Sequence, residues 1–350
     1  MSALGGWGGW GGWGLSGADA NPLLSEALTQ NRGAVVGPFQ GATLPVDLPL
    51  PLDKPDRLTR WDVVPRLQAC EIELLSGLVF TVKGEAITVS FVDLQSKPFK
   101  DHALTHLVRP TKKVFKQQLD LVANYAELRE SRGSEVLAEA MPSQVPFWGS
   151  IIGLQPHRHK WTQELIALAL SMTVDIEMRL KHAFACPRPA ELSPQIQPML
   201  QTPGHASWPS GHSTESFMVA TLIQALLQHA NGTGKALEEQ LQRLAARVAV
   251  NRTVAGLHYP VDSAVGRLLG TALADFFVAR CLGGKIHQRG FDGPKFHGPK
   301  DSVVDFDPRV SMIDNKSGYY QYSSTASTIA ASPLLAFMWK KAAAEWQPLK

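Results

Sequence analysis

The chain has 350 residues, which is enough for one large or two smaller folded domains. Its 34 Lys and Arg residues nearly balance its 31 Asp and Glu residues, and the net charge of +3 excludes a chain-wide electrostatic attraction to nucleic acid or an acidic membrane. A hydrophobic content of 44% with 19% charged residues excludes a highly charged disordered chain.

Residues 1–60 are predicted to lie outside the main folded domain. Trp7, Trp10 and Trp13 recur in a glycine-rich, low-complexity arm, which fits either a mobile tail or a segment that binds a partner or another subunit. From residue 22 to about residue 65 prolines interrupt the chain, so we expect an irregular wrapping segment. The first twenty residues lack a basic start and a continuous apolar centre, so we predict no secretory signal and, by default, a cytoplasmic location.

Residues 61–350 are predicted to form a single, mainly α-helical domain. Alternation of apolar and polar residues over 79–92, around Lys83-Gly84, predicts a β-hairpin, the only strand pair expected. After residue 283 the chain is expected to be rich in loops. Apolar residues at three- and four-residue spacing predict helices over 104–132, 159–184, 212–230, 235–254 and 259–282, with a short helix at 332–345. We therefore expect a helical bundle with one minor β-hairpin and long loops, among them a proline-rich connector at 187–209.

Neither a membrane span nor a cysteine-based scaffold is predicted. The longest apolar stretches fall short of the roughly 20 residues that a spanning helix needs. Residues 165–174 are followed by Asp175, and residues 216–234 include several polar side chains. The three cysteines, Cys70, Cys186 and Cys281, have neither paired spacing nor the spacing of zinc ligands.

A first basic motif, at residues 181–189, lies where a helix should end. Pro187 and Pro189 cannot continue a helix, so the helix that begins near residue 159 must stop near Phe184. Lys181 then falls in the last turn and Arg188 lies just beyond it. Taken alone, a lysine at this place would do no more than compensate the helix dipole.

A second motif, at residues 208–213, precedes an amphipathic helix. Ser210 and Gly211 lie at the predicted helix start, where unpaired backbone N–H groups and the positive end of the helix dipole favour an oxyanion. His212 adds a titratable proton donor at the same place. Taken alone, a serine before a helix would be an ordinary N-cap.

A third motif, at residues 251–262, spans the junction of two predicted helices. Gly256 suits the end of one helix and Pro260 the first turn of the next, so His258 falls between them. Asp262 can bind one imidazole nitrogen and leave the other aimed into a pocket. Taken alone, this would be a buried polar pair. Together the three motifs supply the cations, the donors and the two imidazoles that a tetrahedral oxyanion site requires.

The motifs K-x6-R-P, P-S-G-H and R-x5-H-x3-D, in this order, resemble the signature of a superfamily. It joins type-2 phosphatidic acid phosphatases, bacterial non-specific acid phosphatases and vanadium-dependent haloperoxidases. Asn251 stands where that family usually has Ser. The resemblance implies an acid–base role for His212 and makes His258 either the phosphate nucleophile or the axial ligand of vanadate. The residues that it implies for holding the oxyanion are Lys181, Arg188, Ser210, Gly211 and Arg252.

Neighbouring residues favour the haloperoxidase branch of this resemblance. His205, seven residues before His212, and Trp208, directly before P-S-G-H, resemble the haloperoxidase form of the second motif, and a His at position 205 points to bromide or iodide. Met178 departs from that form, which often has Trp there. The lipid phosphatases of the family span membranes, which this chain is not expected to do. A soluble phosphatase acting through a phosphohistidine is the alternative, and a non-catalytic oxyanion-binding assembly protein is the second alternative.

The favoured interpretation implies a cofactor and substrates. Vanadate would be the cofactor, and phosphate or sulfate would fit the same site. Hydrogen peroxide and a halide would be the substrates, with a small organic acceptor, and the resemblance implies a homo-oligomer. No nucleic-acid partner is expected, because the short basic cluster at residues 112–116 is typical of an ordinary solvated helix face.

Overall fold

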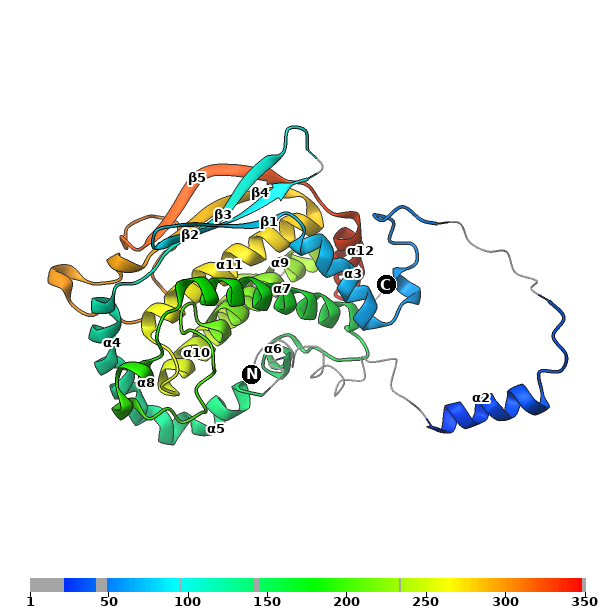
Figure 1. Ribbon diagram of the computed structural model, residues 1–350, viewed down its shortest axis with the longest axis horizontal. Helices are drawn as coiled ribbons and strands as arrows, with labels where there is room; N and C mark the ends of the chain where they lie inside the picture. The colour runs from blue at the N-terminus through cyan, green and yellow to red at the C-terminus, as the bar shows by residue number, and fades with distance from the viewer. Residues whose placement is uncertain (1–21, 42–48, 95, 142–144, 233, 348–350) are drawn as a thin grey trace.

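The computed structural model describes residues 22–41, 49–94, 96–141, 145–232 and 234–347. The tryptophan arm therefore lies outside the described residues. Within them a bundle of helices is covered on one side by a β-sheet (Figure 1). The helices are α2 (Pro22–Ala34), α3 (Val63–Leu75), α4 (Lys112–Tyr125), α5 (Arg129–Glu139), α6 (Val145–Ile152), α7 (Lys160–Phe184), α8 (Pro189–Leu192), α9 (Gly211–Asn231), α10 (Lys235–Val254), α11 (Pro260–Leu282) and α12 (Pro333–Ala344).

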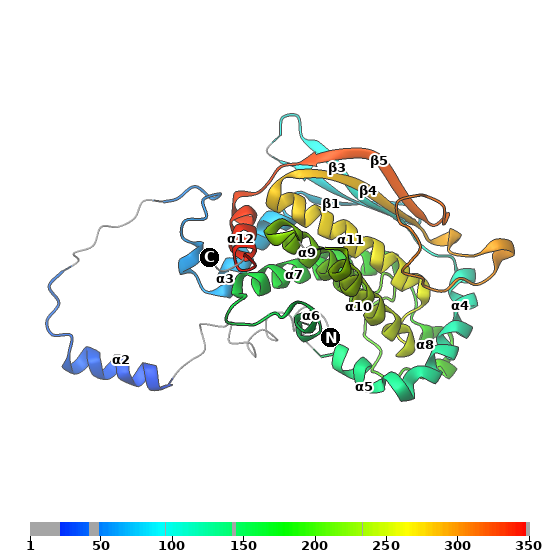
Figure 2. The same ribbon diagram turned by 180° about the vertical axis from the view of Figure 1, so that it is seen from behind.

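The central helices confirm the periodicity of the sequence. Helices α7, α9, α10 and α11 start and end within one or two residues of their predicted bounds. Each is delimited by a local signal, such as Pro260 in the first turn of α11 or the left-handed Ala185 after α7. Most residues of α7, α9 and α11 are buried, so these helices form the core of the bundle. Seen from behind, α9 and α10 lie in front of α7 (Figure 2).

The β-sheet is larger than the single minor hairpin that the sequence predicted. The hairpin itself is confirmed, because β1 (Leu78–Lys83) pairs antiparallel with β2 (Ala86–Asp93). Three further strands, β3 (Lys100–Val108), β4 (Gly284–Asp292) and β5 (Tyr320–Ile329), extend it to a five-stranded sheet in the order β1-β2-β3-β4-β5. All neighbours are antiparallel except β3 and β4, which are parallel. The sheet lies over α11 in both views (Figures 1 and 2).

Two other expectations were wrong in the same way. The helix predicted from residue 104 begins only at Lys112, because residues 100–108 belong to β3. The region after Gly283, expected to be rich in loops, contributes β4 and β5. The segment expected to be irregular contains α2, which buries none of its residues and extends away from the bundle in Figure 1. The connector at 187–209 includes the short helix α8.

Helices α9 and α11 cross at very close range. A side chain at Gly270 of α11 would overlap the backbone carbonyl of Thr214 in α9, so only a glycine allows this approach. The first turns of these two helices carry His212 and Asp262. The crossing therefore sets how far apart the second and third sequence motifs lie. Among the described residues, no helix combines the length and the apolar character needed to cross a bilayer.

Candidate active site

The end of α7 places Lys181 inside the protein. Its side chain is almost fully buried, and its ammonium group donates to the carbonyl oxygens of Ala206, Ser207 and Pro209 in the loop before α9. Burial lowers the pKa of Lys181 to about 8. The lysine thus joins the first and second motifs, which goes beyond the compensation of a helix dipole.

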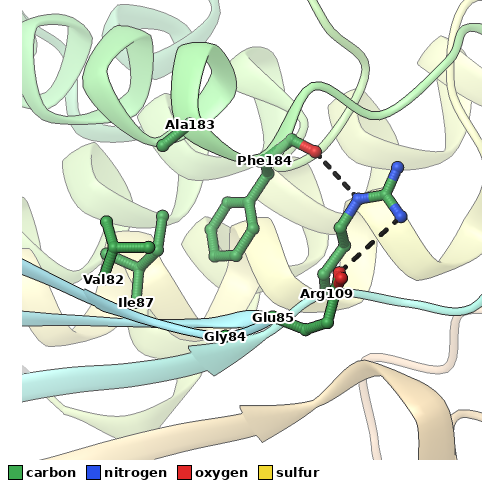
Figure 3. Close-up of a pocket in the computed structure, with 7 residues that line it drawn as sticks. All are labelled: Val82, Gly84, Glu85, Ile87, Arg109, Ala183 and Phe184. Atoms are coloured by element: carbon green, nitrogen blue, oxygen red, sulfur yellow. Dashed lines mark hydrogen bonds and ion pairs between the residues drawn. The ribbon is translucent and has the colours of Figure 1, made fainter.

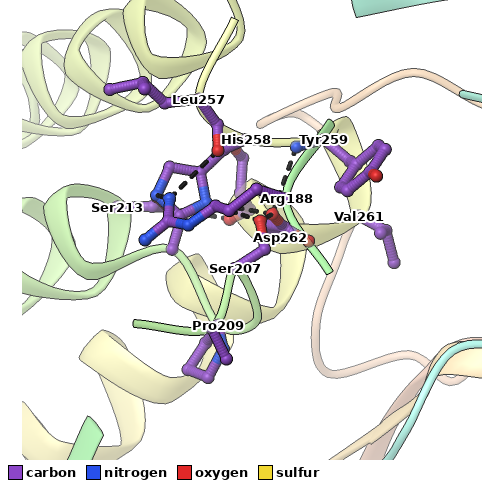
Figure 4. Close-up of polar contacts among 12 residues, drawn as sticks. Arg188, Ser207, Pro209, Ser213, Leu257, His258, Tyr259, Val261 and Asp262 are labelled. Carbon is purple, nitrogen blue, oxygen red and sulfur yellow. Dashed lines mark hydrogen bonds and ion pairs between the residues drawn. The ribbon is translucent and has the colours of Figure 1, made fainter. Parts of the chain in front are cut away.

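Arg188 joins the first motif to the third. Its Nη1 lies 3.0 Å from the carbonyl oxygen of Leu257 and 2.9 Å from Nε2 of His258. Its Nε donates to the carbonyl oxygen of His205 at 3.0 Å, and its Nη2 lies 3.1 Å from Nδ1 of the same histidine. The guanidinium is buried and forms the centre of the polar network in Figure 4.

His258 is oriented by the first turn of α11. Its Nδ1 lies 2.9 Å from Oδ2 of Asp262, and this oxygen also accepts from the Tyr259 backbone N–H at 3.1 Å and from the Ser207 hydroxyl (Figure 4). Because an ionised carboxylate only accepts, the proton of the neutral imidazole sits on Nδ1, and Nε2 presents its lone pair. Burial and the charges of Arg188 and Lys181 lower the pKa of His258 well below its ordinary value, which keeps it neutral.

Ser210 occupies the N-cap position of α9 without acting as a side-chain cap. Its backbone N–H donates to the carbonyl oxygen of Asp262 at 3.1 Å, which joins the second motif to the third. The hydroxyl makes no capping hydrogen bond, is buried and has no hydrogen-bond partner among the described residues. Buried hydroxyl groups are rarely left unpaired. The side chain is therefore free to bind a group that the protein does not itself supply.

Arg252, in the last turn of α10, is buried beside the same region. Its Nη2 forms an ion pair of 2.7 Å with Glu139 and also donates to the carbonyl oxygen of Val136. Its Nε is buried and, within the described part of the chain, lacks an acceptor. Glu139 is held in turn by Asn251, whose amide donates to its other oxygen at 2.9 Å. One face of the guanidinium is thus fixed while one of its donors stays available.

His212, in the first turn of α9, faces the same charges. Burial and the positive charge of Arg252 lower its pKa well below the ordinary value, and a hydrogen bond to the Glu139 backbone opposes that shift. It also interacts electrostatically with Lys181 and His258. The structure therefore brings the two imidazoles, the three cations and the start of α9 into one buried cluster.

The range that contains this cluster has a known counterpart. Residues 161–282 match the PAP2 superfamily. The match runs from α7 to the end of α11 and includes all three motifs. The PAP2 superfamily covers both phosphatases and haloperoxidases, so the match is compatible with either activity and does not distinguish them. The comparison with curated proteins finds no significant match.

Three side chains that contact this cluster were not predicted from the sequence. Ser207 binds Asp262, and Glu177 lies against Gly211, both within the PAP2 range. Glu139 comes from α5, outside that range, and lies 113 residues before Arg252 in the chain. Ser207 could have been suspected from its place between His205 and the second motif. Glu139 and Glu177 had no comparable signal, because only tertiary packing selects them.

The two residues singled out for halide contact are placed differently. His205 is partly buried and touches Arg188, so it borders the PAP2 cluster. Burial lowers its pKa to about 4. Trp208 is fully buried, and its ring packs edge-on against Phe184, with centroids 4.5 Å apart, and tilted against Phe291 of β4. Trp208 thus anchors the loop between the end of α7 and the sheet, whereas His205 contacts Arg188 of the cluster.

A separate pocket lies between the β1–β2 hairpin and the end of α7. Figure 3 shows Arg109 at this pocket, where it donates to the carbonyl oxygen of Phe184 at 2.8 Å and pairs with Glu85 at 3.8 Å. Its other lining residues are Val82, Gly84, Ile87 and Ala183. None of the residues of the three motifs that were predicted to bind the oxyanion lines it. The candidate site is therefore the buried cluster of the two imidazoles, the three cations and the start of α9, and not this pocket.

Proposed function

We propose that the protein is a vanadate-dependent haloperoxidase, which uses hydrogen peroxide to oxidise bromide or iodide to hypohalous acid. The observation that carries the oxyanion part of this proposal is the pair of unsatisfied donors, Ser210 Oγ and Arg252 Nε. Both are buried in a cluster that already contains three cationic side chains. Donors left unpaired beside buried positive charge are suited to a tetrahedral anion.

The residues present fit vanadate as the bound group. Lys181, Arg188 and Arg252 would oppose its charge, Ser210 and Gly211 would donate to its oxygens, and His258 would provide the coordinating Nε2. Vanadate, when bound, supplies Lewis-acid activation of hydrogen peroxide. Phosphate or sulfate would fit the same donors. Since Arg188 Nη1 now donates to Nε2 of His258, that contact must open before this nitrogen can coordinate.

The histidines would then divide the remaining work. Asp262 holds His258 in the Nδ1–H form, so that Nε2 stays unprotonated. His212 is kept neutral by burial and by Arg252, so it can accept a proton from hydrogen peroxide and return it later. The contact of His205 with Arg188 places an imidazole at the border of the site, which supports bromide or iodide as the substrate. A small organic acceptor and a homo-oligomer remain predictions.

A phosphatase is the second candidate, and one observation favours it directly. His258, with its Nδ1 bound to Asp262, has the orientation of an activated nucleophile and would attack phosphorus through Nε2. The bond from the phosphorus to the leaving alcohol would break as the phosphohistidine forms, and His212 would protonate that alcohol. Water would then release phosphate. Both activities use the same residues, so an assay has to separate them.

The test uses the full chain, stripped of bound ions and then supplied with either vanadate or phosphate. We expect peroxide-dependent bromide oxidation only with vanadate, and its loss in His258→Ala. His287→Ala serves as the matched control, because this imidazole lies on β4 and contacts Ser323 and Tyr322. Phosphomonoester hydrolysis without halide oxidation would favour the phosphatase. Full bromide oxidation by His258→Ala would overturn the haloperoxidase, and vanadate binding without either activity would favour an assembly protein.

A further inference from the structure

Ser207, in the loop before α9, bonds to three parts of the candidate site at once. Its backbone N–H donates to the carbonyl oxygen of Cys186, in the first motif, at 3.0 Å. Its carbonyl oxygen accepts from Lys181 Nζ at 3.2 Å, and its hydroxyl donates to Oδ2 of Asp262 in the third motif. The residue is completely buried. One small residue thus lies where the first and third motifs meet.

The hydroxyl of Ser207 has a role that the backbone contacts do not share. The bonds to Cys186 and Lys181 use backbone atoms, so they would remain with another side chain at this position. The hydroxyl oxygen lies 2.5 Å from Oδ2 of Asp262 and 3.3 Å from Nδ1 of His258, as the close-up shows (Figure 4). It therefore contacts both members of the pair that orients the imidazole. Removal of the hydroxyl alone separates its role from that of the loop.

The carboxylate of Asp262 is held through only one of its oxygens. Oδ2 accepts from the Ser207 hydroxyl, from the Tyr259 backbone N–H at 3.1 Å and from the imidazole of His258 at 2.9 Å. Oδ1 is buried and has no hydrogen-bond partner among the described residues. Besides the imidazole that it orients, the carboxylate thus has two donors, and without Ser207 it would keep only the backbone N–H.

These contacts do not fit a nucleophilic serine. In a Ser-His-Asp triad the carboxylate binds one imidazole nitrogen and the hydroxyl lies at the other. Here the hydroxyl and the carboxylate both lie at Nδ1 of His258, whereas Nε2 faces Nη1 of Arg188. Because an ionised carboxylate only accepts, Ser207 uses its proton on Asp262 and can offer His258 only a lone pair. Both contacts favour the imidazole form that carries its proton on Nδ1.

We propose that Ser207 is a positioning residue, whose hydroxyl fixes the carboxylate of Asp262 and thereby the orientation of His258. The inference rests on the proposed function, because it concerns the step that takes place at Nε2 of His258. Ser207 itself would touch neither the ion nor the substrate. In the described part of the chain, its hydroxyl makes no hydrogen bond to the three cationic side chains that are proposed to hold the ion.

The experiment compares Ser207→Ala with the unaltered full chain, in whichever of the two assays the unaltered protein is active. We expect kcat to fall roughly 10- to 100-fold, because the carboxylate that orients His258 loses one of its donors. Isothermal titration with inorganic phosphate should give a Kd within about twofold of the unaltered value, because the side chains proposed to hold the ion are unchanged. Ser207→Cys, which keeps a weaker donor, should lose less activity than Ser207→Ala.

A matched control and a double variant show whether Ser207 acts through Asp262. Ser263→Ala removes the next buried hydroxyl of α11, which donates to the carbonyl oxygen of Ala249 at 3.2 Å, and it should keep the unaltered kcat. In Asp262→Asn, addition of Ser207→Ala should lower kcat by less than about twofold more, because the carboxylate is already absent. The same fold loss with and without Asp262 would overturn the proposal.

A second measurement requires no turnover. The Nδ1 proton of His258, assigned by its absence in His258→Ala, should exchange slowly with water in NMR spectra of the unaltered chain, because it is buried and bonded to Asp262. Ser207→Ala should exchange it at least about tenfold faster while its thermal transition stays cooperative. Unchanged kcat with unchanged exchange would overturn the role of Ser207. If the unaltered protein catalyses neither reaction, the proposed function falls, and the exchange rate alone decides the role of Ser207.

Discussion

The hydroxyl of Ser210 either caps α9 or is available to bind an ion, and a Ser210→Ala variant distinguishes the two roles. If it capped the helix, Ser210→Ala would lower the free energy of unfolding by about 1 kcal/mol. It makes no capping hydrogen bond, however, and is buried without a partner. Removing an unsatisfied buried hydroxyl relieves a desolvation cost of about 1–3 kcal/mol. We therefore expect the ligand-free variant to be as stable as the unaltered protein or slightly more stable.

The bound ion should reverse this order. At a phosphate concentration of 100 times Kd, the unaltered protein gains about 2.7 kcal/mol of stability. Loss of one hydrogen bond to a charged oxygen weakens binding by about 1.5–3 kcal/mol, which raises Kd roughly 10- to 100-fold. The same phosphate concentration then stabilises Ser210→Ala by only about 0.4–1.4 kcal/mol.

The assay is urea unfolding with and without phosphate, followed by circular dichroism. Ser213→Ala is the matched control, because this buried hydroxyl of the same helix donates to the carbonyl oxygen of Ser263 at 2.8 Å. It should lose about 1 kcal/mol with or without phosphate and keep the full effect of the ion. Ser210 would be a simple cap, and the reasoning refuted, if Ser210→Ala lost stability without phosphate yet kept the full gain with it.

Two further outcomes follow from the cluster. Asp262→Asn should lower the activity found in the vanadate and phosphate assay by roughly 10²- to 10⁴-fold, because His258 loses the acceptor that fixes its tautomer. Steady-state rates, measured on a variant with an unchanged circular dichroism spectrum, check this prediction. A loss of activity under threefold would contradict it. As pH rises through about 8, Lys181 loses its proton, so the phosphate affinity of the unaltered protein should fall more steeply with pH than that of Lys181→Arg. Titration calorimetry from pH 7 to 9.5 measures both affinities. The same dependence of affinity on pH in the two proteins would contradict this prediction.

The long helices were predictable because two independent signals coincide in each. In α7 and α11, apolar periodicity is bounded by prolines or by a left-handed residue. Strand β3 misled the same logic, because Ala103, Leu104, Leu107 and Val108 are spaced as on a helix. Strand β5 has mostly Ser and Thr at its centre, so its low hydrophobicity suggested a loop. Strand β5 is held in the sheet by its antiparallel pairing with β4, which its own residues do not indicate.

In the candidate site too, some residues had a local sequence signal and others depend on tertiary packing. The places of Lys181 at a helix end and of His258 at a helix junction followed from local sequence, while their assignment to one site needed the three motifs together and the family resemblance. Glu139 and Glu177 had no such signal, since a carboxylate within a helix has many exposed uses and only its neighbours in space give it a role. Of the two residues assigned to halide contact, His205 borders the cluster and Trp208 packs in the core. Bulk and aromatic character alone did not indicate which of these two environments Trp208 would occupy.

The glycine contact between α9 and α11 holds the two helices at a fixed distance. With no side chain between the helices at Gly270, the two backbones pack so closely that a single added carbon would overlap the carbonyl oxygen of Thr214. The spacing of His212 and Asp262 is therefore as rigid as the helix crossing itself. Surface loops can be lengthened, exchanged or grafted to admit new substrates while this rigid frame keeps the chemistry in register.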